Sequence, residues 1–175
     1  MVMNEIFLKG EKVVLRRVVE EDYPTFLRWL NDPEIRVALT VRYPVDVAYL
    51  KNRLAEGVYL SIIFEDKLAG YVALKDINQL NQRAYLETVV GGQHRRRGVG
   101  KDALITLLNY AFNELNLRKV LLEVYEFNQT AYELYKKVGF VLEGRLRQNS
   151  YKLGKFYDLL IMGMLREEFN NPNNI

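Results

Sequence analysis

The sequence contains no cysteine and only one histidine, His94. Without cysteine there is no disulfide, no thiolate metal ligand and no thiol nucleophile, so ping-pong chemistry through an enzyme thiol is excluded. One histidine cannot build a histidine-rich zinc site, and any histidine base would have to be His94. We therefore predict a protein that holds no metal and has no disulfide.

Long apolar runs are also missing from the chain. No stretch approaches the ~20 apolar residues of a membrane helix, and the first residues lack the basic and apolar regions of a signal peptide. These absences predict a cytoplasmic protein that does not enter a membrane. The formal net charge of +3, from 25 basic and 22 acidic residues, is too small to indicate nucleic-acid binding by itself.

What the sequence does contain is enough apolar material for one core. Its 175 residues are 49% hydrophobic, which suits one domain and is too little for two. We predict a single domain over residues 1–168 and a polar, disordered tail over 169–175. Apolar periodicity predicts an α/β protein with a mixed sheet: strands at 12–18, 59–65, 68–77, 83–90, 118–127, 140–147 and 155–165, and helices at 20–32, 46–56, 104–115 and 128–138.

A basic, glycine-containing loop follows the strand predicted at 83–90 and precedes a predicted helix. It is not the phosphate-binding loop of nucleotide triphosphatases, because Arg95 stands where the first glycine is needed and Asp102 replaces the metal-binding hydroxyl. It does match the dinucleotide fingerprint G-x-G-x-x-A. In that fingerprint the first glycine directly follows a strand, whereas here three arginines intervene.

A third interpretation uses every feature of this loop. Free N–H groups at a helix N-terminus bind anions, glycines let the backbone approach the ligand closely, and flanking arginine and lysine add positive charge. A pyrophosphate with further phosphate nearby would suit such a loop. A solvated basic turn or a nucleic-acid patch is the alternative for a bare arginine triplet.

Arg95, Gly98 and Gly100 match the pattern Q/R-x-x-G-x-G/A. About thirty residues later, N-x-x-A-x-x-x-Y-x-x-x-G-F is matched by Asn128, Ala131, Tyr135, Gly139 and Phe140. These two motifs resemble those of the GCN5-related N-acetyltransferase (GNAT) superfamily, in which the first is the acetyl-CoA signature. The order of predicted strands and helices is similar to that of the family, and residues 143–165 resemble its ribosomal-protein-acetylating subgroup.

The resemblance implies a GNAT fold of about seven mostly antiparallel strands flanked by four helices. It also implies transfer of acetyl from acetyl-CoA to a primary amine, either a protein N-terminus or a small molecule, in a ternary complex without a metal. Two other classes stay open: a dinucleotide-binding oxidoreductase, and a non-catalytic module that binds CoA or nucleic acid. Exposed edge strands make a homodimer an expectation as well.

Catalytic roles follow from the same resemblance and from chemistry. Tyr135 matches the family's tyrosine that protonates the leaving thiolate, although it also shares an apolar helix face and could be a core residue. Glu87 is the candidate base that takes the amine proton, directly or through water, with a half-exposed structural glutamate as the alternative. His94 is interpreted as a loop residue. Trp29, Arg36 and Tyr43 lie where the family covers its acceptor pocket.

The cofactor site is predicted on two segments and one helix cap. The strand end should pair its backbone with the pantetheine arm, and the loop should hold the pyrophosphate. Asn128 should cap its helix and lie beside the cofactor. The predicted cofactor-binding residues are Val89, Val90, Gly91, Arg95, Arg96, Arg97, Gly98, Val99, Gly100, Lys101 and Asn128.

Overall fold

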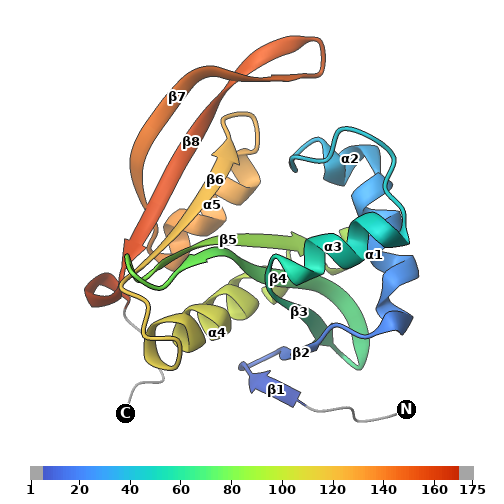
Figure 1. Cartoon of the computed structure of the whole chain (residues 1–175), viewed down its shortest axis with the longest axis vertical. Coiled ribbons are helices and arrows are strands. Elements are labelled where there is room, and N and C mark those ends of the chain that lie inside the picture. The colour runs from blue at the N-terminus through green and yellow to red at the C-terminus, as the bar shows by residue number, and fades with distance from the viewer. Residues whose placement is uncertain (1–5, 170–175) are drawn as a thin grey trace.

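The computed structural model describes residues 6–169. Of the tail predicted at 169–175, only Phe169 lies inside them, and its ring packs against Phe112 at 5.3 Å between centroids. Residues 170–175 lie outside the described residues. Figure 1 shows strands and helices mixed along the chain. The strands are β1 (Ile6–Lys9), β2 (Val14–Arg17), β3 (Gly57–Phe64), β4 (Lys67–Asn78), β5 (Arg83–Val90), β6 (Lys119–Tyr125), β7 (Val141–Lys152) and β8 (Lys155–Leu165). The helices are α1 (Tyr23–Asn31), α2 (Pro33–Arg36), α3 (Val47–Ala55), α4 (Val99–Asn113) and α5 (Gln129–Val138), with 3-10 turns at Glu20–Asp22, Gly92–His94 and Arg166–Glu168.

All eight strands form one sheet in the order β1-β2-β3-β4-β5-β6-β8-β7. Every neighbouring pair is antiparallel except β5 and β6, which are parallel. That parallel pairing covers only Arg83–Tyr85 against Lys119–Leu121. Beyond it the two strands diverge (Figure 1), so the sheet opens in its middle. The predicted mixed, mostly antiparallel α/β fold is confirmed.

Helices cover the two faces of the sheet with separate apolar clusters. On one face α4 buries an apolar stripe that includes Leu104, Leu107 and Leu108, each fully buried. On the other face α1 and α3 pack on β3–β5 around Phe26 and Tyr71, whose ring centroids lie 5.1 Å apart. Because each helix buries a stripe at helical spacing, the periodicity in the sequence identified these helices correctly.

The helix α4 begins at Val99, five residues before its predicted start. Other differences from the sequence prediction occur where elements are short or exposed. The edge strand β1 has four residues, none of them buried, and α2 is a single turn that begins at Pro33. Neither is long enough to show a period. The turn between β3 and β4 is Glu65–Asp66, one residue earlier than predicted, because both residues take positive φ, as in a type I′ hairpin, and Lys67 pairs with Phe64.

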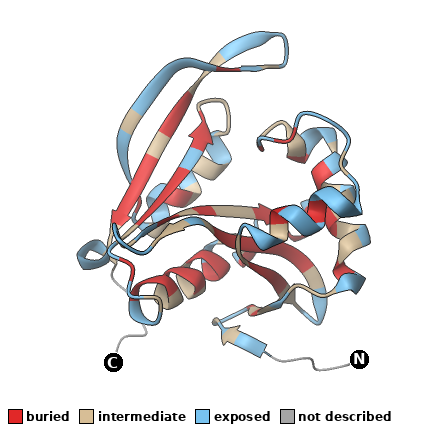
Figure 2. Ribbon diagram, in the orientation of Figure 1, coloured by how far each residue is buried: buried red, intermediate tan, exposed pale blue. Residues whose placement is uncertain are grey.

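The last two strands form a long hairpin arm, defined here as residues 141–165. β7 continues to Lys152, five residues beyond the predicted end, and it is the outer strand of the pair. Figure 2 shows β7 largely exposed and β8 largely buried. The arm ends in a tight turn with Leu153 and Gly154 at positive φ. Among residues 6–169, no helix is both long and apolar enough to cross a bilayer.

Candidate active site

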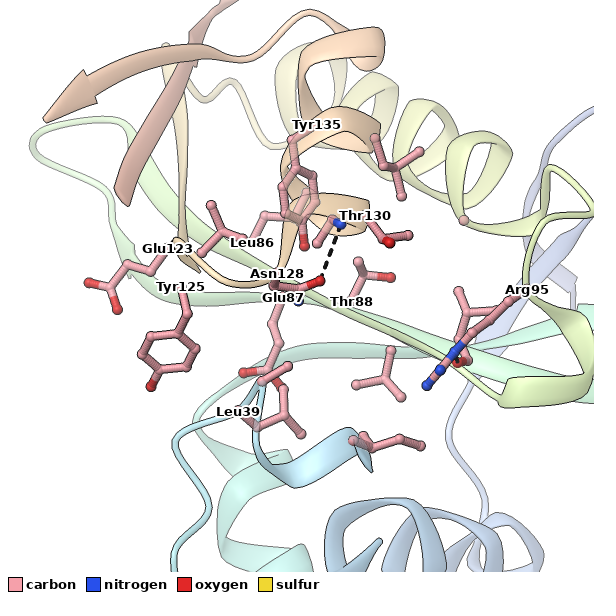
Figure 3. Close-up of a pocket in the computed structure, with 18 of the residues that line it drawn as sticks. Leu39, Leu86, Glu87, Thr88, Arg95, Glu123, Tyr125, Asn128, Thr130 and Tyr135 are labelled. Atoms are coloured by element: carbon pink, nitrogen blue, oxygen red, sulfur yellow. Dashed lines mark hydrogen bonds between the residues drawn. The ribbon is translucent and has the colours of Figure 1, made fainter. Parts of the chain in front are cut away.

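A cleft of about 890 Å³ opens where β5 and β6 diverge. Its walls come from both strands, from the first turns of α4 and α5, and from the segment 34–40 around α2. Figure 3 shows Glu87 and Thr88 of β5 and Tyr125 of β6 around this space, with Leu39 on the α2 side. Residues distant in the sequence therefore meet in one cavity, at a size typical of small-molecule and cofactor sites.

The N-terminus of α4 supplies an anion-binding end to the cleft. Gly98 precedes the helix with φ +84°, a conformation that favours glycine, and no side chain caps the helix there. The first N–H groups of this 15-residue helix are therefore free to bind an anion, and the helix dipole adds positive potential. Gly98 and Gly100 both line the cleft.

The basic side chains of the loop divide into two groups. Arg95, Arg96 and Lys101 line the cleft, and the Nε of Arg95 also donates to the carbonyl oxygen of Val90 at 3.1 Å. Arg97 does not line it. Its guanidinium pairs with Glu65 at 2.5 Å and lies 4.6 Å from the ring centroid of Phe64. The sequence pattern could not separate these arginines, because a positive φ at Arg96 turns the chain between its neighbours.

Four other predicted cofactor residues differ in how they can contribute. Val89 and Val90 line the cleft, on the edge of β5 that has no partner strand beyond Tyr85. Gly91 does not, because its N–H donates to the carbonyl oxygen of Ala69 and the Trp29 ring lies against it. Val99 is fully buried in the core and offers only its backbone to the cleft.

Tyr135 has a buried ring and a hydroxyl that faces the cleft. Its side chain is 7% exposed, and its ring packs edge-on against Phe140 at 6.0 Å between centroids. The hydroxyl points into the cleft (Figure 3) and has no hydrogen-bond partner within residues 6–169. Burial, and then the charge of Glu87, raise the pKa of Tyr135 well above its ordinary value. The hydroxyl therefore stays protonated at neutral pH and can donate a proton or hydrogen bond to a ligand.

Asn128 holds the start of α5 beside this tyrosine. Its side-chain oxygen accepts the N–H of Ala131 at 3.3 Å, the dashed line in Figure 3. Asn128 also lines the cleft. A cap and a contact with a ligand are compatible here, because capping uses one lone pair of the amide oxygen and leaves the amide N–H groups free.

The carboxylate of Glu87 is bonded on both of its oxygens. Oε1 accepts from Arg53 at 2.6 Å and from the hydroxyl of Tyr71 at 2.8 Å, and Oε2 accepts from Lys75 at 2.7 Å. Burial raises the pKa of Glu87, but the charges of Arg53 and Lys75 outweigh burial and leave the pKa below its ordinary value. A carboxylate held in this way is a weak base, so the geometry argues against direct proton abstraction by Glu87.

The sequence analysis did not identify Arg53 and Lys75 as partners of Glu87, although their positions in the apolar pattern indicate them. Arg53 shares the buried face of α3 with Leu50, so it is a cation on an apolar stripe. Lys75 alternates with Tyr71 and Ala73 on β4, and Ala73 pairs directly with Glu87 across the sheet. A charged residue at a position whose period predicts burial indicates a buried ion pair.

His94 is buried near the other end of the cleft. It is 4% exposed, lies edge-on to Phe64 at 6.3 Å between ring centroids, and lines the cleft. Its Nδ1 has no partner among the described residues. It lies in the turn Gly92–His94, on the loop side of the cleft, as the sequence predicted.

Comparison with known proteins decides the family. The Acetyltransferase (GNAT) domain matches residues 12–141, well over half of the chain. The chain belongs to the GNAT acetyltransferase family. It is an N-acetyltransferase that uses acetyl-CoA as cosubstrate and an amine as acceptor. This family assignment argues against the two alternatives considered from the sequence, a dinucleotide-binding oxidoreductase and a non-catalytic binding module.

Individual relatives agree with this assignment. The SPbeta prophage-derived uncharacterized N-acetyltransferase YokL of Bacillus subtilis (strain 168) is 28% identical over 173 residues, covering 95% of this chain and 97% of its own. Spermidine N(1)-acetyltransferase of Vibrio cholerae is 31% identical over 107 residues, covering 61% and 62%. A crystal structure of spermidine N-acetyltransferase from Vibrio cholerae with CoA and spermine superposes with a TM-score of 0.84 at 23% identity, covering 91% of this chain and 98% of that one, which supports the fold.

Proposed function

We propose that this GNAT enzyme transfers acetyl directly from acetyl-CoA to the acceptor amine in a ternary complex, with Tyr135 as the general acid. The amine nitrogen attacks the thioester carbonyl, the C–N bond forms, and the C–S bond breaks. The departing thiolate needs a proton, and a tyrosine with a raised pKa supplies it while remaining protonated beforehand. The observation that carries this proposal is the free hydroxyl of Tyr135 pointing into the cleft.

In this proposal the cofactor lies along β5 and ends at α4. The pyrophosphate binds the free N–H groups of the first turn of α4, with Arg95, Arg96 and Lys101 adding charge. The pantetheine amides pair with the free edge of β5 at Val89 and Val90. Gly98 takes the positive φ that starts α4, Val99 offers its backbone N–H, and Gly100 lines the cleft. Gly91 and Arg97 support the loop from outside the cleft.

Glu87 contributes to amine deprotonation only through a water in this proposal. Its carboxylate keeps the negative charge that Arg53 and Lys75 stabilise, and a water bonded to it can pass the amine proton to solvent. The base therefore does not need a raised pKa. The water accepts the proton that the amine releases at its own pKa, and desolvation in the cleft lowers this amine pKa.

Two acceptor classes are candidates. A protein N-terminus is the class of the ribosomal-protein-acetylating subgroup, which residues 143–165 resemble. A polyamine is the second class, because relatives in Vibrio cholerae and Escherichia coli are named spermidine N(1)-acetyltransferases. Exposed carboxylates that line the cleft favour this second candidate, since they could bind ammonium groups: Glu34, Asp76 and Glu123.

The test compares two tyrosine variants on α5. Tyr135→Phe should lower kcat about a hundredfold or more with little change in the KM for acetyl-CoA, because the lost interaction is made only in the transition state. Tyr132→Phe is the matched control, since Tyr132 lies on the same helix outside the cleft wall. Acetyl transfer is followed by thiol release and by mass spectrometry of the product. An unchanged kcat in a folded Tyr135→Phe enzyme would reject the acid role.

Cofactor selectivity is tested by calorimetric titration with acetyl-CoA, dephospho-CoA, NAD and ATP at one salt concentration. Preferential binding of acetyl-CoA is expected. Equal or tighter binding of NAD would contradict the placement of the phosphates on the loop.

A further inference from the structure

We propose that the acceptor is a peptide N-terminus whose first residue binds through its main chain to the free edge of β6. The carbonyl oxygen of Glu123 accepts an N–H of the acceptor amine, and the N–H of Tyr125 donates to the carbonyl oxygen of the same acceptor residue. This inference rests on the proposed function and narrows its acceptor class.

The edge of β6 that faces the cleft has a partner strand only at its beginning. β6 pairs with β5 from Lys119 to Leu121, and beyond this point the two strands diverge in Figure 1. Glu123, Val124 and Tyr125 line the cleft that opens between them. A strand edge of this kind presents N–H and C=O groups to which an extended chain can bind as an added strand.

The pairing of β6 with β8 shows which backbone groups face the cleft. The N–H of Glu126 donates to the carbonyl oxygen of Asp158 on the β8 side, so this residue directs its backbone groups toward β8. The direction of these groups alternates along an antiparallel strand. Glu123 and Tyr125 therefore direct their N–H and C=O groups away from β8 and into the cleft.

Three of these cleft-facing groups are free. The N–H and C=O of Glu123 and the N–H of Tyr125 have no partner within residues 6–169. The carbonyl oxygen of Tyr125 is occupied, because it accepts the N–H of Asn128 at 2.8 Å. The free edge ends there, so it suits a single extended residue. In the parallel arrangement such a residue donates to Glu123 and accepts from Tyr125.

This arrangement holds the acceptor amine at the narrow end of the cleft. Glu123 follows closely on Leu121, the last residue of β6 that pairs with β5, and Tyr125 lies farther toward the wide end. A neutral amine that donates one N–H to the carbonyl oxygen of Glu123 keeps its lone pair for attack on the thioester, in a fixed orientation. The side chains of Glu87 and Tyr135 face the same space in Figure 3.

The free groups of β6 distinguish a peptide from a polyamine. A polyamine carries N–H donors and methylene groups, so it leaves the N–H of Tyr125 without an acceptor. The first residue of a peptide supplies both a donor and an acceptor. The carboxylates of Glu34, Asp76 and Glu123 in the cleft wall do not separate the two classes, because both kinds of amine are positively charged before deprotonation. The backbone of β6 therefore favours the peptide.

The experiment compares three forms of one acceptor, trialanine amide. The first is unmodified. The second has a trans-alkene in place of the first peptide bond, which removes the carbonyl oxygen and keeps the extended shape. The third has an N-methyl group on the first peptide bond, whose N–H faces away from β6 in this arrangement. The value of kcat/KM is measured at saturating acetyl-CoA on the high-pH plateau, where every amine is neutral, and spermidine is measured beside the peptides.

We expect the alkene peptide to lose about tenfold in kcat/KM, because it leaves the N–H of Tyr125 unpaired. The N-methyl peptide should stay within about threefold of the unmodified one, since a tertiary amide remains mainly trans. The ratio between the unmodified and alkene peptides should persist in Glu123→Ala, because the main chain makes these contacts. Loss of the ratio in that variant would assign it to the carboxylate and overturn this inference.

Equal kcat/KM values for the three peptides, or a higher value for spermidine than for the unmodified peptide, would also overturn this inference. The direct-transfer proposal would survive either result, because Tyr135→Phe tests it with whichever acceptor is used. Absence of transfer to peptide and spermidine alike would overturn the acceptor assignment, and calorimetric binding of acetyl-CoA by the same protein would then uphold the cofactor site separately.

Discussion

Nη2 of Arg53 lies 2.6 Å from Oε1 of Glu87, with only 9% and 12% of the two side chains exposed. This pair joins α3 to the middle of the sheet, beneath the cleft. Burying two charges costs free energy unless the geometry compensates, and here Tyr71 and Lys75 complete the bonding of the carboxylate. The pair is therefore both part of the active-site floor and a support for the helix that covers it.

Removal of this arginine should destabilise the fold. In Arg53→Met, Glu87 keeps Lys75 and Tyr71 but loses its strongest buried partner, so we expect the free energy of unfolding to fall by roughly 2–3 kcal/mol. Lys51→Met is the control on the same helix. Its pair with Glu20 is 54% and 77% exposed, and such exposed pairs contribute less than about 1 kcal/mol. Urea unfolding followed by far-UV circular dichroism measures both, and equal losses would contradict the buried-pair account.

The buried pair of Asp22 and Arg16 predicts how the stability of the fold depends on pH. Burial raises the pKa of Asp22, but hydrogen bonds from Arg16 and Ser61 outweigh it and leave the pKa below its ordinary value of about 3.8. A lowered folded-state pKa gives stability that is present above the unfolded-state pKa and is lost as pH falls through the folded-state pKa. Stability should therefore decrease below about pH 4, as this carboxylate becomes protonated.

Asp22→Asn tests this assignment. The variant keeps the shape of the side chain and loses the ion pair with Arg16, whose atoms approach to 2.7 Å. It should be less stable at pH 7 and should lose less stability than wild type between pH 5 and pH 3. Parallel acid profiles for the two proteins would show that other carboxylates control acid unfolding.

The sequence predicted the parts of this molecule that repeat with a period. Helices such as α4 and the central strands were identified because each buries a regular stripe. The direction of individual side chains could not be read from the same pattern. Arg95 and Arg97 are two residues apart in one basic run, yet one lines the cleft and the other pairs with Glu65, because backbone dihedrals between them decide it.

The surroundings of Glu87 show a second limit of sequence patterns. An acidic residue on the strand beside the loop suggested a base, but its pKa depends on Arg53 and Lys75, 34 and 12 residues away in the sequence. Such partners come together only in the folded sheet. The same is true of Lys152 and Leu39, which lie 113 residues apart and meet because the hairpin arm extends past its predicted end.

The pH dependence of the reaction should follow the acceptor amine and not an enzyme carboxylate. Because the pKa of Glu87 is lowered, it is already ionised at neutral pH and its titration adds no inflection there. For a peptide acceptor, log kcat/KM should rise with a slope of one and level off near the α-amino pKa of about 8. The raised pKa of Tyr135 places loss of the acid above pH 10. An inflection between pH 6 and 7 that disappears in Glu87→Gln would instead identify Glu87 as the direct base.

Substitution of Gly98 tests the phosphate-binding loop through backbone strain. Gly98 has φ +84°, and a Cβ added there would lie 3.2 Å from Nζ of Lys12, on the side of the β1–β2 hairpin. A non-glycine residue in this conformation costs roughly 1–2 kcal/mol, so Gly98→Val should shift the loop and the first N–H groups of α4. We expect loss of acetyl-CoA binding by calorimetry while the circular dichroism spectrum is kept. Gly92→Ala is the control in the same loop region, because a Cβ at Gly92 meets no atom within 4 Å. Tight binding by the Gly98→Val variant would mean that the pyrophosphate lies elsewhere, since a distorted helix N-terminus cannot present its N–H groups to the same ligand.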